Sequence, residues 1–114
     1  MIQIIQSRAT PEQMRHMLES LGIYVKLAVD TRREILAGGG ELHADCEQVL
    51  LTNGSQQPDI WGADWYPTRQ SVGYESIINI RPSAGNRSME IQDPAIRQQV
   101  SKIAHQLLGD VQWS

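Results

Sequence analysis

Three consecutive glycines, Gly38–Gly40, divide a long apolar stretch that runs from Glu34 to Leu51. If it were fully extended, this stretch would span roughly 60 Å, several times the length of an ordinary strand, so the chain must bend within it. Glycine adopts positive φ without a Cβ clash, and we therefore expect the bend at the three glycines. The bend is either a bulge that turns one strand through a corner or a tight reversal between two short strands, and we favour the bulge.

Beyond the glycines, apolar and polar residues alternate, as they do in a strand with one buried face. The apolar positions are Leu42, Ala44 and Cys46, and the polar positions are His43, Asp45 and Glu47. We therefore predict a strand whose polar face carries an imidazole and two carboxylates.

Asn53–Gly54 is a strong hairpin signal, because both residues tolerate the positive φ of a type I′ turn. A two-residue loop there would pair residues 42–51 with the following strand, so that Trp61 and Trp65 face the core and His43 lies opposite Asp64. A longer loop over residues 55–58 would shift the register by one residue and reverse both faces.

Two segments carry helix signals. The first starts at Thr10–Pro11, with Gln13 completing a capping box, and ends before Gly22. The second begins at Asp93–Pro94 and ends before Gly109. The remaining strands are predicted over residues 2–5, 23–29, 34–37 and 74–82, with residues 30–33 forming a turn or prolonging a helix. The predicted fold class is α+β, with two helices packed on one face of a mostly antiparallel sheet of about five strands and the opposite face partly open.

Composition limits the organisation of the chain. Its 114 residues suit a single domain, residues 1–114, with one two-layer core. The net charge of -3 and the pI near 5.5 argue against nonspecific binding of nucleic acid. The single cysteine cannot form an internal disulfide, which fits a reducing cytoplasm, and we expect neither a signal peptide nor a membrane span.

Two sets of polar residues are candidate sites. His43, Asp45, Glu47 and Asp64 could hold a divalent metal ion such as Zn²⁺ or Mn²⁺, the one cofactor that the sequence suggests, or they could form a solvated sheet face. Asn79, Arg81, Asn86 and Arg87 could form an anion pocket, or Arg81 could pair with Glu75 or with a carboxylate on a neighbouring strand.

Four motifs, GELHADCE, WGADWYP, SIINIRP and GNRSMEI, resemble a small bacterial family known only as a domain of unknown function. The resemblance covers roughly residues 24–93. It implies a prokaryotic cytosolic protein and carries no known activity, so no catalytic residue can be transferred from it.

The leading hypothesis is a noncatalytic binding or interaction domain that self-associates through a sheet face or edge, because exposed sheet edges need cover. The alternative is a metal-assisted, hydrolase-like enzyme. In that enzyme His43 and Asp45 would be ligands, Glu47 or Asp64 a ligand or general base, and Arg81 would stabilise an anionic group.

Overall fold

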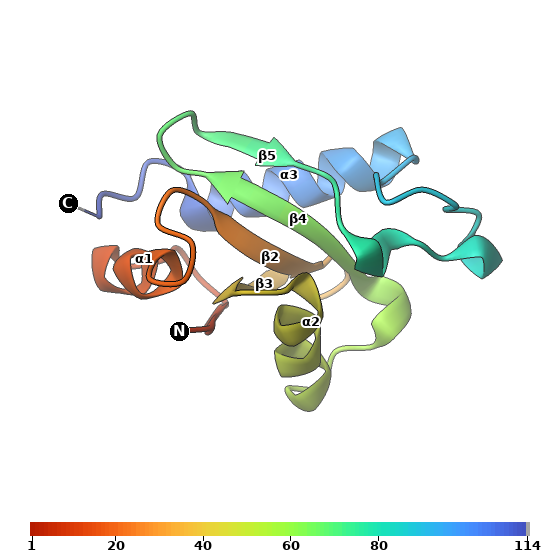
Figure 1. The fold of residues 1–114 in the computed structure, drawn as a ribbon, viewed down its shortest axis with the longest axis horizontal. Helices are drawn as coiled ribbons and strands as arrows, with labels where there is room; N and C mark the ends of the chain where they lie inside the picture. Colours follow the sequence, from red (N-terminus) through yellow and green to blue (C-terminus); the bar gives the residue numbers. More distant parts are fainter. Residues whose placement is uncertain (114) are drawn as a thin grey trace.

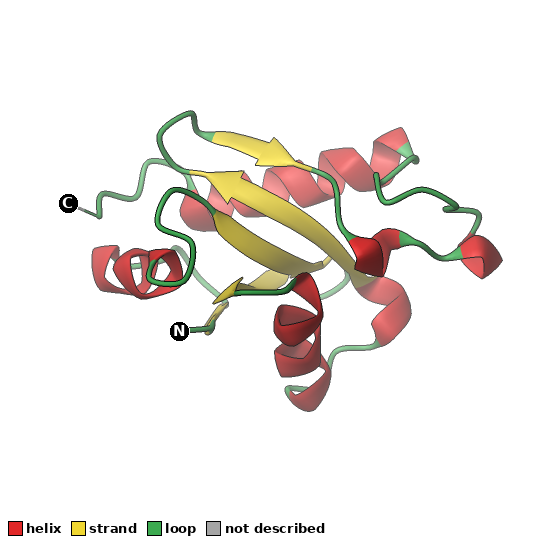
Figure 2. Cartoon of the chain, viewed as in Figure 1, coloured by secondary structure: helices red, strands yellow, loops and turns green. Residues whose placement is uncertain are grey.

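In the computed structural model, which describes residues 1–113, the chain folds around one antiparallel sheet of five strands (Figures 1 and 2). The strands are β1 (Gln3–Ile5), β2 (Val25–Asp30), β3 (Ile35–Gly40), β4 (Ile60–Tyr66) and β5 (Ser71–Gly73). Their order across the sheet is β1-β3-β2-β4-β5, and every neighbouring pair is antiparallel. The predicted α+β class and the sheet of about five strands are confirmed.

Two helices, α1 (Pro11–Leu18) and α3 (Pro94–Leu108), cover one face of the sheet, as predicted (Figure 1). The expected capping box of α1 is present, with Thr10 and Gln13 bonded to each other's backbone N–H groups. The core on this face includes both tryptophans, which point inward as predicted: Trp61 is 5% exposed and Trp65 is fully buried.

The opposite face carries a third helix, α2 (His43–Thr52), where we predicted a strand and a partly open sheet, and that part of the prediction was wrong. Cys46 and Leu50 of α2 pack on Ala28, Ala37 and Ile60 in a second core. The reason is that Cys46 and Leu50 are four residues apart and therefore share one face of a helix. The alternation from Leu42 to Cys46 is too short to distinguish the two-residue period of a strand from the helical period of about 3.6 residues.

The predicted hairpin at Asn53–Gly54 was also wrong, because these residues end α2. Gly54 has a φ of 106° and donates its N–H to Leu51 O at 3.2 Å, while the Ser55 N–H bonds to Leu50 O at 3.0 Å. Together these bonds form a Schellman motif, which closes a helix with the same positive-φ glycine that a type I′ turn uses.

The glycine bend is a bulge within β3, as we favoured. The β2–β3 pairing shifts between Lys26↔Gly40 and Leu27↔Gly38, so that Gly39 is the extra residue, with a φ of 105°. A Cβ there would lie 2.6 Å from Met1 O, so the close approach of the N-terminus also requires glycine. The strand ends at Gly40, however, and does not continue through a corner.

The predicted strand over residues 74–82 was wrong. β5 ends at Gly73, and two short 3₁₀ helices follow, η2 (Ile77–Asn79) and η3 (Pro82–Ala84); another, η1 (Gln57–Asp59), precedes β4. Ser76 Oγ accepts the Ile78 N–H and so starts η2. Among residues 1–113, no helix combines the length and apolar character that crossing a bilayer requires.

Candidate functional site

A cavity of about 410 Å³ opens where α2 begins, and we call it the α2 pocket. Its lining comes from β2, the start of α2, β4 and the irregular segment after β5. The lining residues are Lys26, Leu42, His43, Ala44, Asp64, Glu75, Ser76, Ile77, Ile78 and Met89. This volume lies in the range of about 300–1,000 Å³ that is typical of small-molecule sites.

His43 and Asp64 form a hydrogen-bonded pair in this pocket. His43 is the first residue of α2, and its Nε2 lies 2.9 Å from Asp64 Oδ1 and 3.0 Å from Ala63 O. Each side chain is only 12% exposed. A carboxylate next to an imidazole fixes the orientation and the tautomer of the ring. The two residues predicted to lie opposite each other are therefore neighbours, although a helix rather than a strand presents the histidine.

Apolar side chains dominate the mouth of the pocket. Leu42 is 57% exposed, Ile77 is 74% exposed and Met89 is 39% exposed. Among residues 1–113 only six large apolar side chains are this exposed, and half of them line this one cavity. Large apolar groups gathered around a cavity are typical of a binding site.

Asn79 fastens the wall of the pocket to β4. β5 pairs with β4 only at Asp64–Tyr66, so the outer edge of β4 is free at Gly62. Asn79 occupies this edge: its Oδ1 accepts the Gly62 N–H at 2.8 Å, and its Nδ2 donates to Gly62 O at 3.0 Å and to Met89 O at 3.1 Å. The fully buried amide thus acts as a short piece of strand.

Asn86 extends the same arrangement. Its Nδ2 donates to Asn79 O at 2.8 Å and to Glu90 O at 2.9 Å, and its Oδ1 accepts the Gln92 N–H at 2.8 Å. Asn79 and Asn86, predicted as anion ligands, are thus neighbours, but their amides are bonded to the main chain. Arg87, the fourth of that set, has an exposed side chain.

Arg81 pairs with a carboxylate, but the partner is Glu47 of α2 and not Glu75 or a carboxylate on a neighbouring strand. Arg81 Nη2 lies 3.6 Å from Glu47 Oε2 and also donates to Ile60 O, and the guanidinium lies 4.7 Å from the centre of the Trp61 ring. Burial lowers the pKa of Arg81, and the Glu47 carboxylate opposes this shift. Anion binding by these residues stays a prediction.

The four predicted metal ligands are divided among three places. His43 and Asp64 are paired, Glu47 contacts Arg81, and Asp45 lines a separate cavity. Within residues 1–113 no three His, Cys, Asp or Glu side chains are grouped so that they could hold a metal ion. His43 and Asp64 could supply two ligands, and metal binding also stays a prediction.

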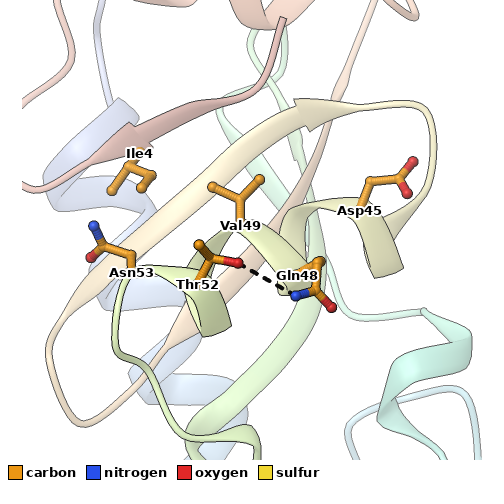
Figure 3. Close-up of a pocket in the computed structure, with 6 residues that line it drawn as sticks. All are labelled: Ile4, Asp45, Gln48, Val49, Thr52 and Asn53. Carbon is orange, nitrogen blue, oxygen red and sulfur yellow. Dashed lines mark hydrogen bonds between the residues drawn. The ribbon is translucent and has the colours of Figure 1, made fainter.

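The separate cavity lies between α2 and the edge strand β1 and has a volume of about 400 Å³ (Figure 3). It is lined by Ile4, Asp45, Gln48, Val49, Thr52 and Asn53. Asp45 is its only charged residue, and in Figure 3 it lies at the end of the groove away from Asn53. We call this cavity the β1 groove; it offers less varied chemistry than the α2 pocket.

Sequence reasoning missed most of the α2 pocket, including Lys26, Glu75, Ile77 and Met89. We had assigned Glu75 and Ile77 to a strand, where an outward isoleucine is unremarkable. The available signal was the pair Ser76 and Pro82, since serine starts helical turns and proline interrupts central strands.

A model of the protein family described as "Protein of unknown function (DUF5674)" matches residues 3–107. The resemblance to a family of unknown function is therefore confirmed. No curated protein and no solved structure matches the chain.

Proposed function

The chain belongs to the DUF5674 family, and we propose that it is a noncatalytic binding domain whose ligand places an apolar group in the α2 pocket. The single observation that carries this proposal is the gathering of exposed Leu42, Ile77 and Met89 around one cavity. Removing apolar surface from water is favourable by about 25 cal/mol per Å², so a ligand that covers these side chains gains affinity.

The polar groups of the pocket support this proposal because ligand sites combine apolar walls with a few fixed polar groups. The His43–Asp64 pair is nearly buried and held by a 2.9 Å contact. Lys26 is fixed as well, since its Nζ donates to Glu41 O at 2.9 Å. Groups that are already in place lose little freedom when a ligand binds, so they favour one orientation of it.

Nile red, an uncharged dye that fluoresces in apolar surroundings, tests the proposal. We expect its fluorescence to rise with the wild-type protein and to fall at least severalfold with Ile77→Ser. Ile23→Ser is the matched control, because Ile23 is 78% exposed, about as much as Ile77, and does not line the pocket. Equal fluorescence from both variants, each with an unchanged melting temperature, would refute the proposal.

Self-association is a second part of the proposal. β1 and β5 are the two edge strands, and each is three residues long. A second copy that paired with either edge would cover its free backbone groups. Light scattering across a dilution series tests this, and a monomer at every concentration would remove it.

The metal-assisted enzyme is kept as the alternative. In that case Zn²⁺ or Mn²⁺ should raise the melting temperature of the wild-type protein but not that of His43→Ala, because a ligand that binds only the folded state stabilises it.

A further inference from the structure

The hydrogen bonds around His43 fix which ring nitrogen carries the proton. Nε2 lies next to two acceptors, Asp64 Oδ1 and Ala63 O, and neither of them can donate. Nε2 must therefore carry a hydrogen. In the neutral imidazole this leaves Nδ1 with a lone pair, which makes it a hydrogen-bond acceptor.

His43 Nδ1 is available to accept a hydrogen bond from a ligand. Within residues 1–113 it makes no hydrogen bond, and it is not among the buried atoms that lack a partner, so it keeps contact with solvent. His43 is one of the residues that line the α2 pocket, and Asp64 holds its ring in place.

The other charged groups of the pocket are two carboxylates and one ammonium, so acceptors outnumber donors and their formal net charge is -1. Asp64 and Glu75 are carboxylates, and within residues 1–113 Glu75 makes no ion pair. Lys26 is the one cationic side chain of the lining, and its ammonium group already donates to Glu41 O. A ligand that brings a donor therefore matches this pocket, whereas a carboxylate or phosphate would meet two like charges and only one opposite charge, that of Lys26.

We propose that the ligand of the α2 pocket carries a hydrogen-bond donor, an alcohol or an amine, at the end of an apolar body, and that this group donates to His43 Nδ1. The apolar body would lie against Ile77 and Met89. This inference rests on the proposed function, because it requires the pocket to be a ligand site.

Three probes with one apolar body separate the chemistries: benzyl alcohol, benzylamine and benzoate. Their affinities can be measured by displacement of Nile red from the wild-type protein. We expect the alcohol, the amine or both to bind at least about tenfold more tightly than benzoate. Preference for the amine would indicate that Asp64 and Glu75 contribute through their charge, and equal binding of both donors would assign the preference to Nδ1 alone.

His43→Gln tests the role of Nδ1 directly. The glutamine amide can still donate to Asp64 and Ala63 O from the place of Nε2, but it has no acceptor at the place of Nδ1. We expect this variant to keep binding Nile red and to bind the preferred donor probe about fivefold more weakly, the loss typical of one hydrogen bond. His16→Gln, on α1 and outside the pocket, should bind the probes like the wild-type protein.

The outcomes separate the two proposals. If Nile red binds and benzoate binds as tightly as the donors, or if His43→Gln keeps full affinity for them, the inference is overturned while the pocket remains. If neither Nile red nor any probe binds, the proposed function itself fails. Should His43→Gln fail to fold, the ¹⁵N resonance of His43 Nδ1 can be followed in the wild-type protein as benzyl alcohol is added, because a hydrogen bond to this atom moves its resonance; an unmoved resonance would overturn the inference.

Discussion

Replacing Asn79 by alanine should lower the free energy of unfolding more than replacing any exposed residue does. The reason is that the Asn79 amide occupies the free edge of β4. Its side chain is fully buried and exchanges two hydrogen bonds with Gly62, at 2.8 and 3.0 Å. It also holds Met89 O at 3.1 Å, and so keeps the wall of the α2 pocket against the sheet. Asn79→Ala would remove these three bonds and a longer one to Tyr74 O, at 3.3 Å, and would leave a cavity in place of the amide group.

The size of the effect follows from these contacts. A buried hydrogen bond contributes about 1 kcal/mol net, and a buried donor left without a partner costs about 1–3 kcal/mol. Losing the bonds to Gly62 and Met89, and leaving the Gly62 N–H without a partner, should lower the free energy of unfolding by about 4 kcal/mol. That is a large share of the roughly 5–15 kcal/mol that stabilises an ordinary domain.

Urea denaturation followed by tryptophan fluorescence measures this change, because Trp61 and Trp65 are buried in the folded state. Asn53→Ala is the matched control: Asn53 is exposed and accepts one bond, from Arg33 Nη2 at 2.8 Å, so it should cost no more than about 1 kcal/mol. If Asn79→Ala lowers the free energy of unfolding by less than about 1 kcal/mol, Asn79 does not hold the pocket wall against β4.

Two further predictions concern buried ionisable groups. Burial raises the pKa of the Cys46 thiol from 9.0 to about 11, so between these values the unfolded chain loses a proton that the folded chain keeps. The free energy of unfolding should therefore fall by up to about 3 kcal/mol as the pH rises from 9 to 11, and Cys46→Ala should lose this dependence, as urea titrations at each pH can show. Arg81→Met should cost about 3–5 kcal/mol because it leaves Glu47 buried beside an apolar side chain. Adding Glu47→Leu should recover most of that loss in the same assay, and a double variant no more stable than the single one would contradict the pairing.

Local signals with one physical meaning were sufficient to predict α1 and α3. Thr10 and Gln13 form the capping box that their spacing requires, and Asp93 accepts the Ala95 N–H at 2.9 Å. Such caps join residues two or three positions apart. They can therefore be recognised from the local sequence without knowledge of the rest of the fold.

The region from Leu42 to Gly54 was misread because its signals have two meanings. Alternation over a few residues fits a strand, and spacing of four residues fits a helix; packing of Cys46 and Leu50 on the second face of the sheet decides between them. Asn53–Gly54 likewise suits a hairpin turn or a helix end, and only the pairing of distant strands distinguishes the two.

The candidate site was predicted in part. His43 and Asp64 do meet, although the predicted register that joined them does not exist. The apolar mouth could not be predicted, because long-range hydrogen bonds bring Ile77 and Met89 together. Asn79 bonds Gly62 and Met89, which are 17 and 10 residues away, and the Ser76 N–H donates to Met89 O at 3.0 Å. Contacts of this kind depend on the whole fold rather than on a local pattern.

The most direct test of a ligand site at the α2 pocket is a ¹H–¹⁵N chemical-shift map of the protein titrated with benzyl alcohol. Our account predicts that the largest shifts fall on the residues around the pocket, above all His43, Ala44 and Ile77. Shifts concentrated on Ile4, Val49 and Thr52 in the β1 groove, or no saturable shift anywhere, would contradict it.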